Sequence, residues 1–142
     1  MIVDSSAVVA IVTKEECAID LLHALRMATR VFMSAATYVE LGVVLDRRLT
    51  PEERHRVDAM LTSCDVEIVP NTSSQAKIAR AAYRDFGKGS GHAAHLNMGD
   101  CFSYALASET GEELLFAGES FTHTDVMPAW HPSTLRDDTD PL

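Results

Sequence analysis

The spacing of four short apolar segments most constrains how this chain can fold. The segments are MIVD at the N-terminus, VFMS over residues 31–34, VEIVP over 66–70 and LLFA over 114–117. Their length is typical of buried strands rather than of helices. Long stretches with helical periodicity separate them, so consecutive strands cannot pair through tight turns. Short apolar strands with helices between them predict an α/β fold, with a parallel β-sheet flanked by helices on both faces.

Two helices are expected in each interval between strands. Thr50, Pro51 and Glu53 form a strong helix start, with a capping threonine, a proline in the first turn and a glutamate that closes a capping box. The expected helices are SSAVVAIVT after Asp4, residues 15–28, residues 35–48, Thr50 to about Ser63, residues 71–74 to Phe86, and a last helix around Asp100 after the glycine-rich loop 87–97.

The length of the chain predicts one domain followed by a polar tail. Of the 142 residues, 46% are hydrophobic, which is enough for a core without disulfides. We assign residues 1–130 to the domain and 131–142 to a flexible acidic C-terminal tail. The three cysteines include no CxxC pair, and no segment resembles a leader or a membrane span. A cytoplasmic protein without membrane contact is therefore expected.

The net charge limits how the chain can bind nucleic acid. The formal charge is −9 at pH 7, whereas proteins that rely on non-specific phosphate contacts are usually basic. Either nucleic acid is not the partner, or a local site binds it.

Two aspartates have both a structural and a functional interpretation. Asp4 follows the first strand and can cap the next helix through its side chain. Asp100 lies at the start of an apolar helix, where negative charge interacts favourably with the helix dipole. In a parallel sheet, however, active sites form beyond the carboxyl ends of the strands, and Asp4 lies at such an end.

Glu40 is harder to explain structurally, because it lies in the middle of a predicted helix. Its neighbours on that helix face, Ala36, Val43 and Val44, are apolar. Burying a lone carboxylate costs several kcal/mol, so Glu40 requires a partner. The partner is either an arginine, such as Arg47 or Arg48, or a metal ion.

Convergence of Asp4, Glu40 and Asp100 would favour a metal site. Each pair of carboxylates about 4 Å apart repels by about 4 kcal/mol at an effective dielectric constant of 20. A cation removes this repulsion, and oxygen ligands without a histidine or cysteine cluster favour Mg²⁺, with Mn²⁺ as a substitute. Such a site can activate water for attack at phosphorus.

Four sequence blocks resemble those of a known family. MIVDSSA, SAATYVE, LNMGDCFSYALA and LLFAGESFTHTDV are similar, in order and spacing, to the blocks of PIN domains, most closely VapC-type toxin ribonucleases of bacterial toxin–antitoxin systems. The resemblance implies a Mg²⁺-dependent endoribonuclease, a homodimer and a cognate VapB-type antitoxin that blocks the site. By analogy with the family, the RNA substrate is a tRNA or an rRNA loop.

The resemblance also assigns site residues. The family's first three acids correspond to Asp4, Glu40 and Asp100, which are the implied metal ligands, and the hydroxyl beside the first acid corresponds to Ser6. The fourth block contains Gly118-Glu119-Ser120-Phe121, where members often carry an acidic pair. We predict that Glu119 is the fourth catalytic carboxylate and that Ser120 contributes at most a hydroxyl. Asp125, in Thr124-Asp125, is the alternative, unless three acids suffice.

A row of cations is a weaker candidate for RNA contact. Arg80, Arg84 and Lys88 are spaced four residues apart and are predicted to share one helix face, which is either simply solvated or contacts the RNA backbone. Arg47 and Arg48 are similar candidates.

Two other classes of function fit part of the pattern. A metal-dependent phosphatase-type domain also carries an aspartate after its first strand, but it needs a second aspartate where this chain has Ser6. A catalytically inactive PIN-like binding module would keep the fold without the chemistry. Metal binding distinguishes the inactive module from the nuclease.

Overall fold

Four parallel strands form the predicted sheet. The computed structural model describes residues 1–132, and the strands follow the order β3-β2-β1-β4 across the sheet. In the register, Ile2 lies opposite Phe32 on one side and Leu114 on the other, and Val31 lies opposite Val66. The strands are β1 (Ile2–Val3), β2 (Val31–Ser34), β3 (Val66–Val69) and β4 (Leu114–Leu115).

Six α-helices and one 3₁₀ turn connect and follow the strands in the described chain, so the predicted order is confirmed. They are α1 (Ser5–Val12), α2 (Ala18–Met27), α3 (Ala35–Arg48), α4 (Pro51–Ser63), α5 (Ser73–Phe86), α6 (Met98–Thr110) and η1 (Ser120–His123). The second helix begins at Ala18 rather than at residue 15, because the chain after Lys14 (φ 56°) forms a turn in which the Ala18 N–H donates to the Glu15 carbonyl at 2.9 Å.

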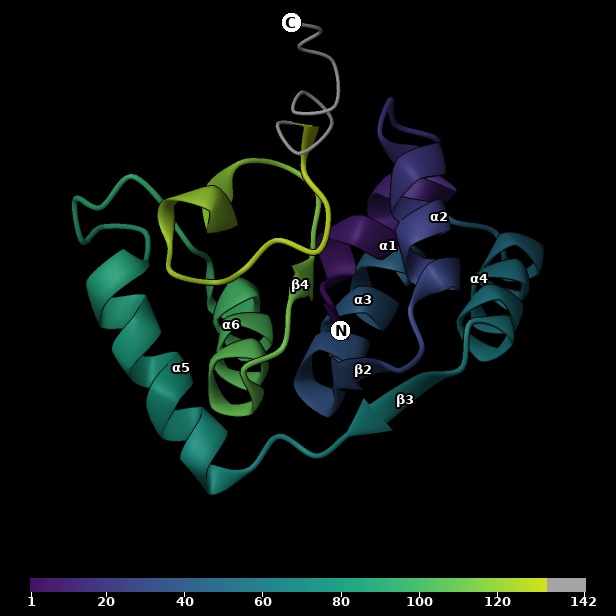
Figure 1. Ribbon diagram of the computed structural model, residues 1–142. Coiled ribbons are helices and arrows are strands. Elements are labelled where there is room, and N and C mark those ends of the chain that lie inside the picture. Colours follow the sequence, from purple (N-terminus) through teal and green to yellow (C-terminus); the bar gives the residue numbers. More distant parts are fainter. Residues whose placement is uncertain (133–142) are drawn as a thin grey trace, which may run out of the picture.

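Helices lie on both faces of the sheet (Figure 1). Each face has a separate hydrophobic core. Val3 and Leu115 face the core formed with α1 to α4, whereas Ile2 and Leu114 face the core formed with α5 and α6. Alternate residues of a strand point to opposite faces, so strands of only two residues still contribute to both cores. The prediction that helices cover both faces is confirmed.

The two edges of the sheet differ. Beyond β4, Leu114 pairs with Pro128, and the Leu114 N–H donates to the Met127 carbonyl at 2.8 Å. β3 forms the other edge, where Glu67 is exposed and Ile68 is 40% exposed. The segment VEIVP is therefore a strand, as predicted, but at an exposed edge.

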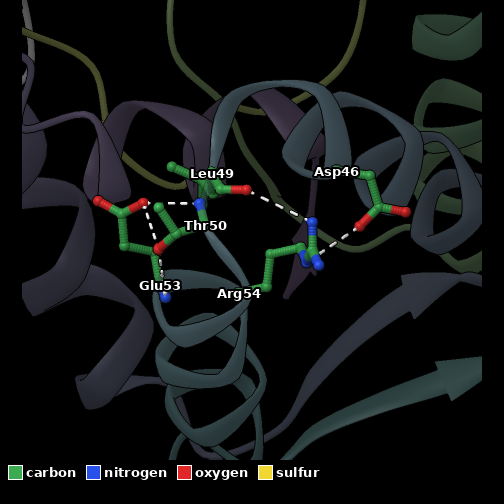
Figure 2. A network of polar contacts seen from close by, with 5 residues as sticks. All are labelled: Asp46, Leu49, Thr50, Glu53 and Arg54. Carbon is green, nitrogen blue, oxygen red and sulfur yellow. Dashed lines mark hydrogen bonds and ion pairs between the residues drawn. The ribbon is translucent and has the colours of Figure 1, made fainter.

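A polar network joins the end of α3 to the start of α4 (Figure 2). The Thr50 N–H donates to Glu53 Oε2 at 2.8 Å and the Glu53 N–H donates to Thr50 Oγ1 at 3.3 Å, which completes the predicted capping box. Arg54 pairs with Asp46 at 3.3 Å and donates to the Leu49 carbonyl at 3.4 Å. These bonds fix the direction of α3, the helix that carries Glu40.

Two further expectations concern cysteines and membranes. Cys17, Cys64 and Cys101 are free thiols. Within residues 1–132 no helix combines the length and the apolar character needed to cross a bilayer. Of the tail predicted over residues 131–142, only His131 and Pro132 belong to the described structure.

Candidate active site

Asp4 is the most buried of the candidate acids, with 1% of its surface exposed. It directly follows β1 and caps α1, where its Oδ2 accepts the Ser6 N–H at 3.0 Å. Its Oδ1 accepts the Ser103 hydroxyl at 2.5 Å. The structural interpretation of Asp4 is therefore correct, and the same carboxylate also takes part in a network that reaches α6.

Two hydroxyl residues that sequence reasoning missed support Asp4. The hydroxyls of Ser103 on α6 and Thr37 on α3 lie 3.2 Å apart, and both residues are buried. Each interrupts the apolar face of its helix, and that interruption was the signal available in the sequence. Buried hydroxyls require partners, and here they link α3 and α6 to Asp4.

Glu40 has no arginine partner among residues 1–132. No ion pair found among the described residues includes it, so the predicted alternative with Arg47 or Arg48 is wrong. Its Oε2 atom is buried without a hydrogen-bond donor. Burial, followed by the negative charges of Asp4 and Asp100, raises the pKa of Glu40 to about 7. Glu40 is thus an acid held near two others without compensation.

The position of Gly99 explains how α6 approaches Glu40 so closely. A Cβ atom added to Gly99 would overlap the carboxylate of Glu40, with both carboxylate oxygens among its nearest neighbours. Only glycine leaves that space open, so the residue before Asp100 is part of the site.

Asp100 has a structural role in addition to its place in the site. Asn97 caps α6, and Asp100 completes a capping box by accepting the Asn97 N–H at 2.9 Å. Burial raises the pKa of Asp100 to about 6, and the charge of Asp4 raises it as well, whereas the Asn97 bond and the charge of Lys88 lower it.

The three acids are electrostatically coupled, and their environment suits a cation. Carboxylates with raised pKa values and an unpartnered buried oxygen favour a hard divalent ion. Within residues 1–132, however, no three His, Cys, Asp or Glu side chains are already grouped closely enough to hold a metal ion between them.

Ser6 belongs to this end of the sheet. Its hydroxyl accepts the Ala117 N–H at 3.1 Å and so holds the chain that leaves β4. Beside it lies a cavity of about 290 Å³, whose lining includes Ser6, Gly118 and Arg48.

The residues predicted from the fourth block do not join the acid cluster. Glu119 is exposed and its Oε1 lies 3.3 Å from His131 Nε2. Asp125 accepts the Tyr104 hydroxyl at 2.8 Å. Neither acid contributes to the pKa shifts of Glu40 and Asp100. Ser120 begins η1, and the Thr124 hydroxyl donates to the Phe121 carbonyl at 2.7 Å, which closes this turn.

Two of the predicted cations, Arg84 and Lys88, occupy different surroundings. Lys88 lies beyond the end of α5 at Phe86, so the prediction that it shares a helix face with Arg84 is wrong, but its charge reaches Asp100. Arg84 pairs with the neighbouring Asp85 through two hydrogen bonds of 2.8 and 3.1 Å.

A sheet of this order, with acids beyond its strand ends, is the arrangement expected for a PIN domain. The sequence matches the model of that family, described as "PIN domain", over residues 1–127. The chain therefore belongs to the PIN-domain family, and the resemblance seen in the four blocks is confirmed.

Within the family, the chain is similar to mycobacterial VapC ribonucleases over most of its length. It is 50% identical over 129 residues to Ribonuclease VapC42 of Mycobacterium tuberculosis, a match that covers 91% of this chain and 98% of that protein. It is 46% identical over 129 residues to Ribonuclease VapC28 of the same species, covering 91% and 97% of the two chains.

Solved structures support the fold. The crystal structure of Mycobacterium tuberculosis VapC20, titled a sarcin–ricin loop cleaving toxin, has a TM-score of 0.69 at 17% identity and covers 89% of this chain and 95% of that one. A toxin–antitoxin complex from Klebsiella pneumoniae has a TM-score of 0.66 at 16% identity, covering 91% and 97%.

The space beside Gly99 generates a prediction. Gly99→Ala will push the Glu40 carboxylate out of place while the helix still forms, so RNA cleavage should fall by about a hundredfold. Gly42→Ala is the matched control, because a Cβ there meets nothing within 4 Å. It should raise the stability by about 1 kcal/mol and leave cleavage unchanged. Equal cleavage by both variants would contradict the role given to Gly99.

The raised pKa of Glu40 generates a second prediction. In the metal-free protein, folding disfavours the ionised form, so the destabilisation is absent below the unfolded pKa of about 4.5 and grows as the pH rises through about 7. Glu40→Gln removes this penalty. In thermal melts with chelator, the melting temperature of Glu40→Gln should exceed that of the parent protein by more at pH 8 than at pH 5. Glu16→Gln, on an exposed turn, is the control and should show no such trend. A gain for Glu40→Gln that does not change with pH would contradict the prediction.

Proposed function

We propose that this protein is a metal-dependent endoribonuclease and the toxin component of a type II toxin–antitoxin system. The observation that carries the proposal is the buried, unpartnered oxygen of Glu40, coupled electrostatically to Asp4 and Asp100. Such repulsion is relieved when one carboxylate takes up a proton or when a cation binds, and a bound cation allows all three acids to stay ionised. The family match and the VapC-named relatives supply the class of reaction.

The metal is proposed to be Mg²⁺, with Mn²⁺ able to substitute. Asp4, Glu40 and Asp100 would hold it, and when bound it would activate water and stabilise charge at the scissile phosphate. Mg²⁺ commonly keeps several waters, so the site does not require three direct carboxylate contacts. This agrees with the observation that the charges of Asp4 and Asp100 raise the pKa of Glu40, although the three side chains do not already surround a metal position within residues 1–132.

The protein's own residues would prepare the site in distinct ways. The bonds from the Ser6 N–H and the Ser103 hydroxyl fix the orientation of Asp4. Glu40, with a pKa of about 7, would be partly protonated at neutral pH and would release that proton as a cation binds, whereas Asp100, with a pKa of about 6, would be mostly ionised already. Lys88 would balance part of the negative charge beside Asp100.

The substrate and partners follow from the family. We propose that the substrate is RNA, in particular a tRNA or rRNA loop, and that a VapB-type antitoxin blocks the acid site in the cytoplasm. A homodimer is also proposed. The exposed side chains of Tyr38, Val39 and Val43, which are 42%, 65% and 48% exposed on α3, could bury apolar surface against a second copy.

One alternative remains. A catalytically inactive PIN-like module is favoured by a single observation, that no three potential ligands are grouped around a metal position within residues 1–132. The phosphatase-type alternative is wrong, because the chain belongs to the PIN-domain family.

Metal binding and cleavage together test the proposal. Mg²⁺ or Mn²⁺ at about ten times its dissociation constant should stabilise the fold by about 1.4 kcal/mol, seen as a higher melting temperature that chelator reverses. Asp100→Asn should abolish cleavage of total RNA, because it removes a metal-binding charge. The asparagine can still accept the Asn97 N–H, so the helix should form.

The control is Asp58→Asn, which removes one acid from the exposed surface of α4. It should retain full cleavage and the full metal-induced shift. Cleavage retained by soluble, folded Asp100→Asn would overturn the nuclease site in this form. A stable, metal-insensitive parent protein would favour the inactive module.

The fourth acid is tested separately through the metal requirement. We propose Glu119 for this role, in which its carboxylate would help to hold the metal after its contact with His131 is released. Glu119→Gln should then raise the Mg²⁺ concentration for half-maximal cleavage, and Ser120→Asp should lower it. Asp125→Asn should change it less, because Asp125 is bonded to Tyr104. The assignment fails if Glu119→Gln titrates like the parent while Asp125→Asn shifts strongly.

A further inference from the structure

The outer face of α5 carries a basic surface in an otherwise acidic protein. Gln75, Ala79 and Ala82 are the buried residues of this helix. The opposite face presents Lys77, Arg80 and Arg84, which together we call the basic face; all are exposed. Figure 1 shows α5 at the outside of the molecule, beside α6. Acidic residues outnumber lysine and arginine by 21 to 12 in the chain, so this concentration of cations is local.

The basic face lines a hollow together with an aromatic side chain. The hollow has a volume of about 620 Å³ and is lined by Lys77, Arg80, Ala81, Tyr83 and Arg84. Tyr83 is 43% exposed. Cations along a groove with an aromatic side chain are the combination that binds single-stranded nucleic acid, because the cations contact phosphates and the ring stacks on bases.

Most of the charge on this face is not neutralised by the protein. No ion pair within residues 1–132 includes Lys77 or Arg80. Arg84 is the exception, because Asp85 holds it through two bonds. The free cations are therefore Lys77 and Arg80, which lie one helical turn apart.

The basic face runs along α5 toward the acid site. Lys77 and Arg84 are seven residues apart, which is about 10 Å along a helix. The chain then leaves α5 and reaches Lys88, whose charge acts on Asp100. The basic face thus leads toward a cation that is already beside the acid cluster.

We infer that the basic face of α5 and Tyr83 form a second RNA-binding surface, which holds the backbone of the substrate outside the acid site. The inference rests on the proposed ribonuclease function and extends it from the cleaved bond to the flanking nucleotides. It explains how a chain of charge −9 can bind a polyanion, since a local row of cations replaces a general positive field.

Binding measurements test this surface apart from catalysis. The probe is a fluorescein-labelled single-stranded RNA of mixed sequence, about 20 nucleotides long so that it exceeds a single site. It is titrated in Mg²⁺ with Asp100→Asn protein, which should not cleave it. Lys77→Ala/Arg80→Ala should weaken binding by about 10–30-fold at 0.1 M salt and reduce the salt slope by about 1.4, as expected for two lost phosphate contacts.

A matched double variant controls for net charge. Arg26→Ala/Arg56→Ala also removes two exposed cations, from α2 and α4, and should leave the affinity and slope nearly unchanged. Tyr83→Ala should weaken binding several-fold without changing the salt slope, and Tyr83→Phe should restore it. Equal losses in the two double variants, or an unchanged slope for Lys77→Ala/Arg80→Ala, would overturn the inference.

Cleavage separates this inference from the proposed function. If the parent protein cleaves total RNA in Mg²⁺ and Lys77→Ala/Arg80→Ala binds and cleaves equally well, only the surface is disproved. If the parent neither binds nor cleaves RNA, the ribonuclease proposal fails with it. Competition by polyglutamate that exceeds competition by RNA would assign the basic face to an acidic protein instead and would also overturn the inference.

Discussion

The fixed, buried carboxylate of Asp4 is the interaction on which the rest of the site depends. One oxygen accepts the Ser6 N–H and the other accepts the Ser103 hydroxyl. Ser103 is bonded in turn to Thr37, so a single side chain joins the end of β1 to α1, α3 and α6. Of these elements, α3 carries Glu40 and α6 carries Asp100. Because Asp4 cannot turn away, its charge acts on both of the other acids and helps to raise their pKa values.

The grouping of three carboxylates at this site lowers the stability of the fold and at the same time creates the environment for reactivity. Like charges held together in a partly buried site weaken the fold unless one of them is protonated or a cation binds. The packing keeps them together nonetheless: Gly99 allows α6 to approach Glu40, and the bonds between Asp46, Leu49 and Arg54 fix the end of α3. Sites that destabilise the protein carrying them are common where function requires them.

The sequence allowed the fold and the convergence of Asp4, Glu40 and Asp100 to be predicted, because both are recorded in local patterns. Strand and helix order follow from apolar periodicity, and Glu40 was identifiable because a carboxylate on an apolar helix face has few structural explanations. The surroundings of Glu119 and Asp125 could not be predicted. Their observed partners, His131 and Tyr104, lie 12 and 21 residues away along the chain. No local pattern encodes which loop side chains meet after the last strand, and the same holds for the support that Ser103 gives Asp4 from 99 residues away.

The unequal edges of the sheet have a consequence for how copies of this protein meet one another. The β4 edge is covered by the segment around Pro128, a residue with no N–H to offer a further strand. In the part of the chain that the structure describes, only the β3 edge presents a ladder that another chain could extend. That strand is four residues long, and Glu67 in its interior has a side chain that is 62% exposed. Glu67 and Arg30, whose charged groups lie 4.0 Å apart, put charged side chains on this edge, and a short charged edge resists the open-ended stacking through which exposed sheets aggregate.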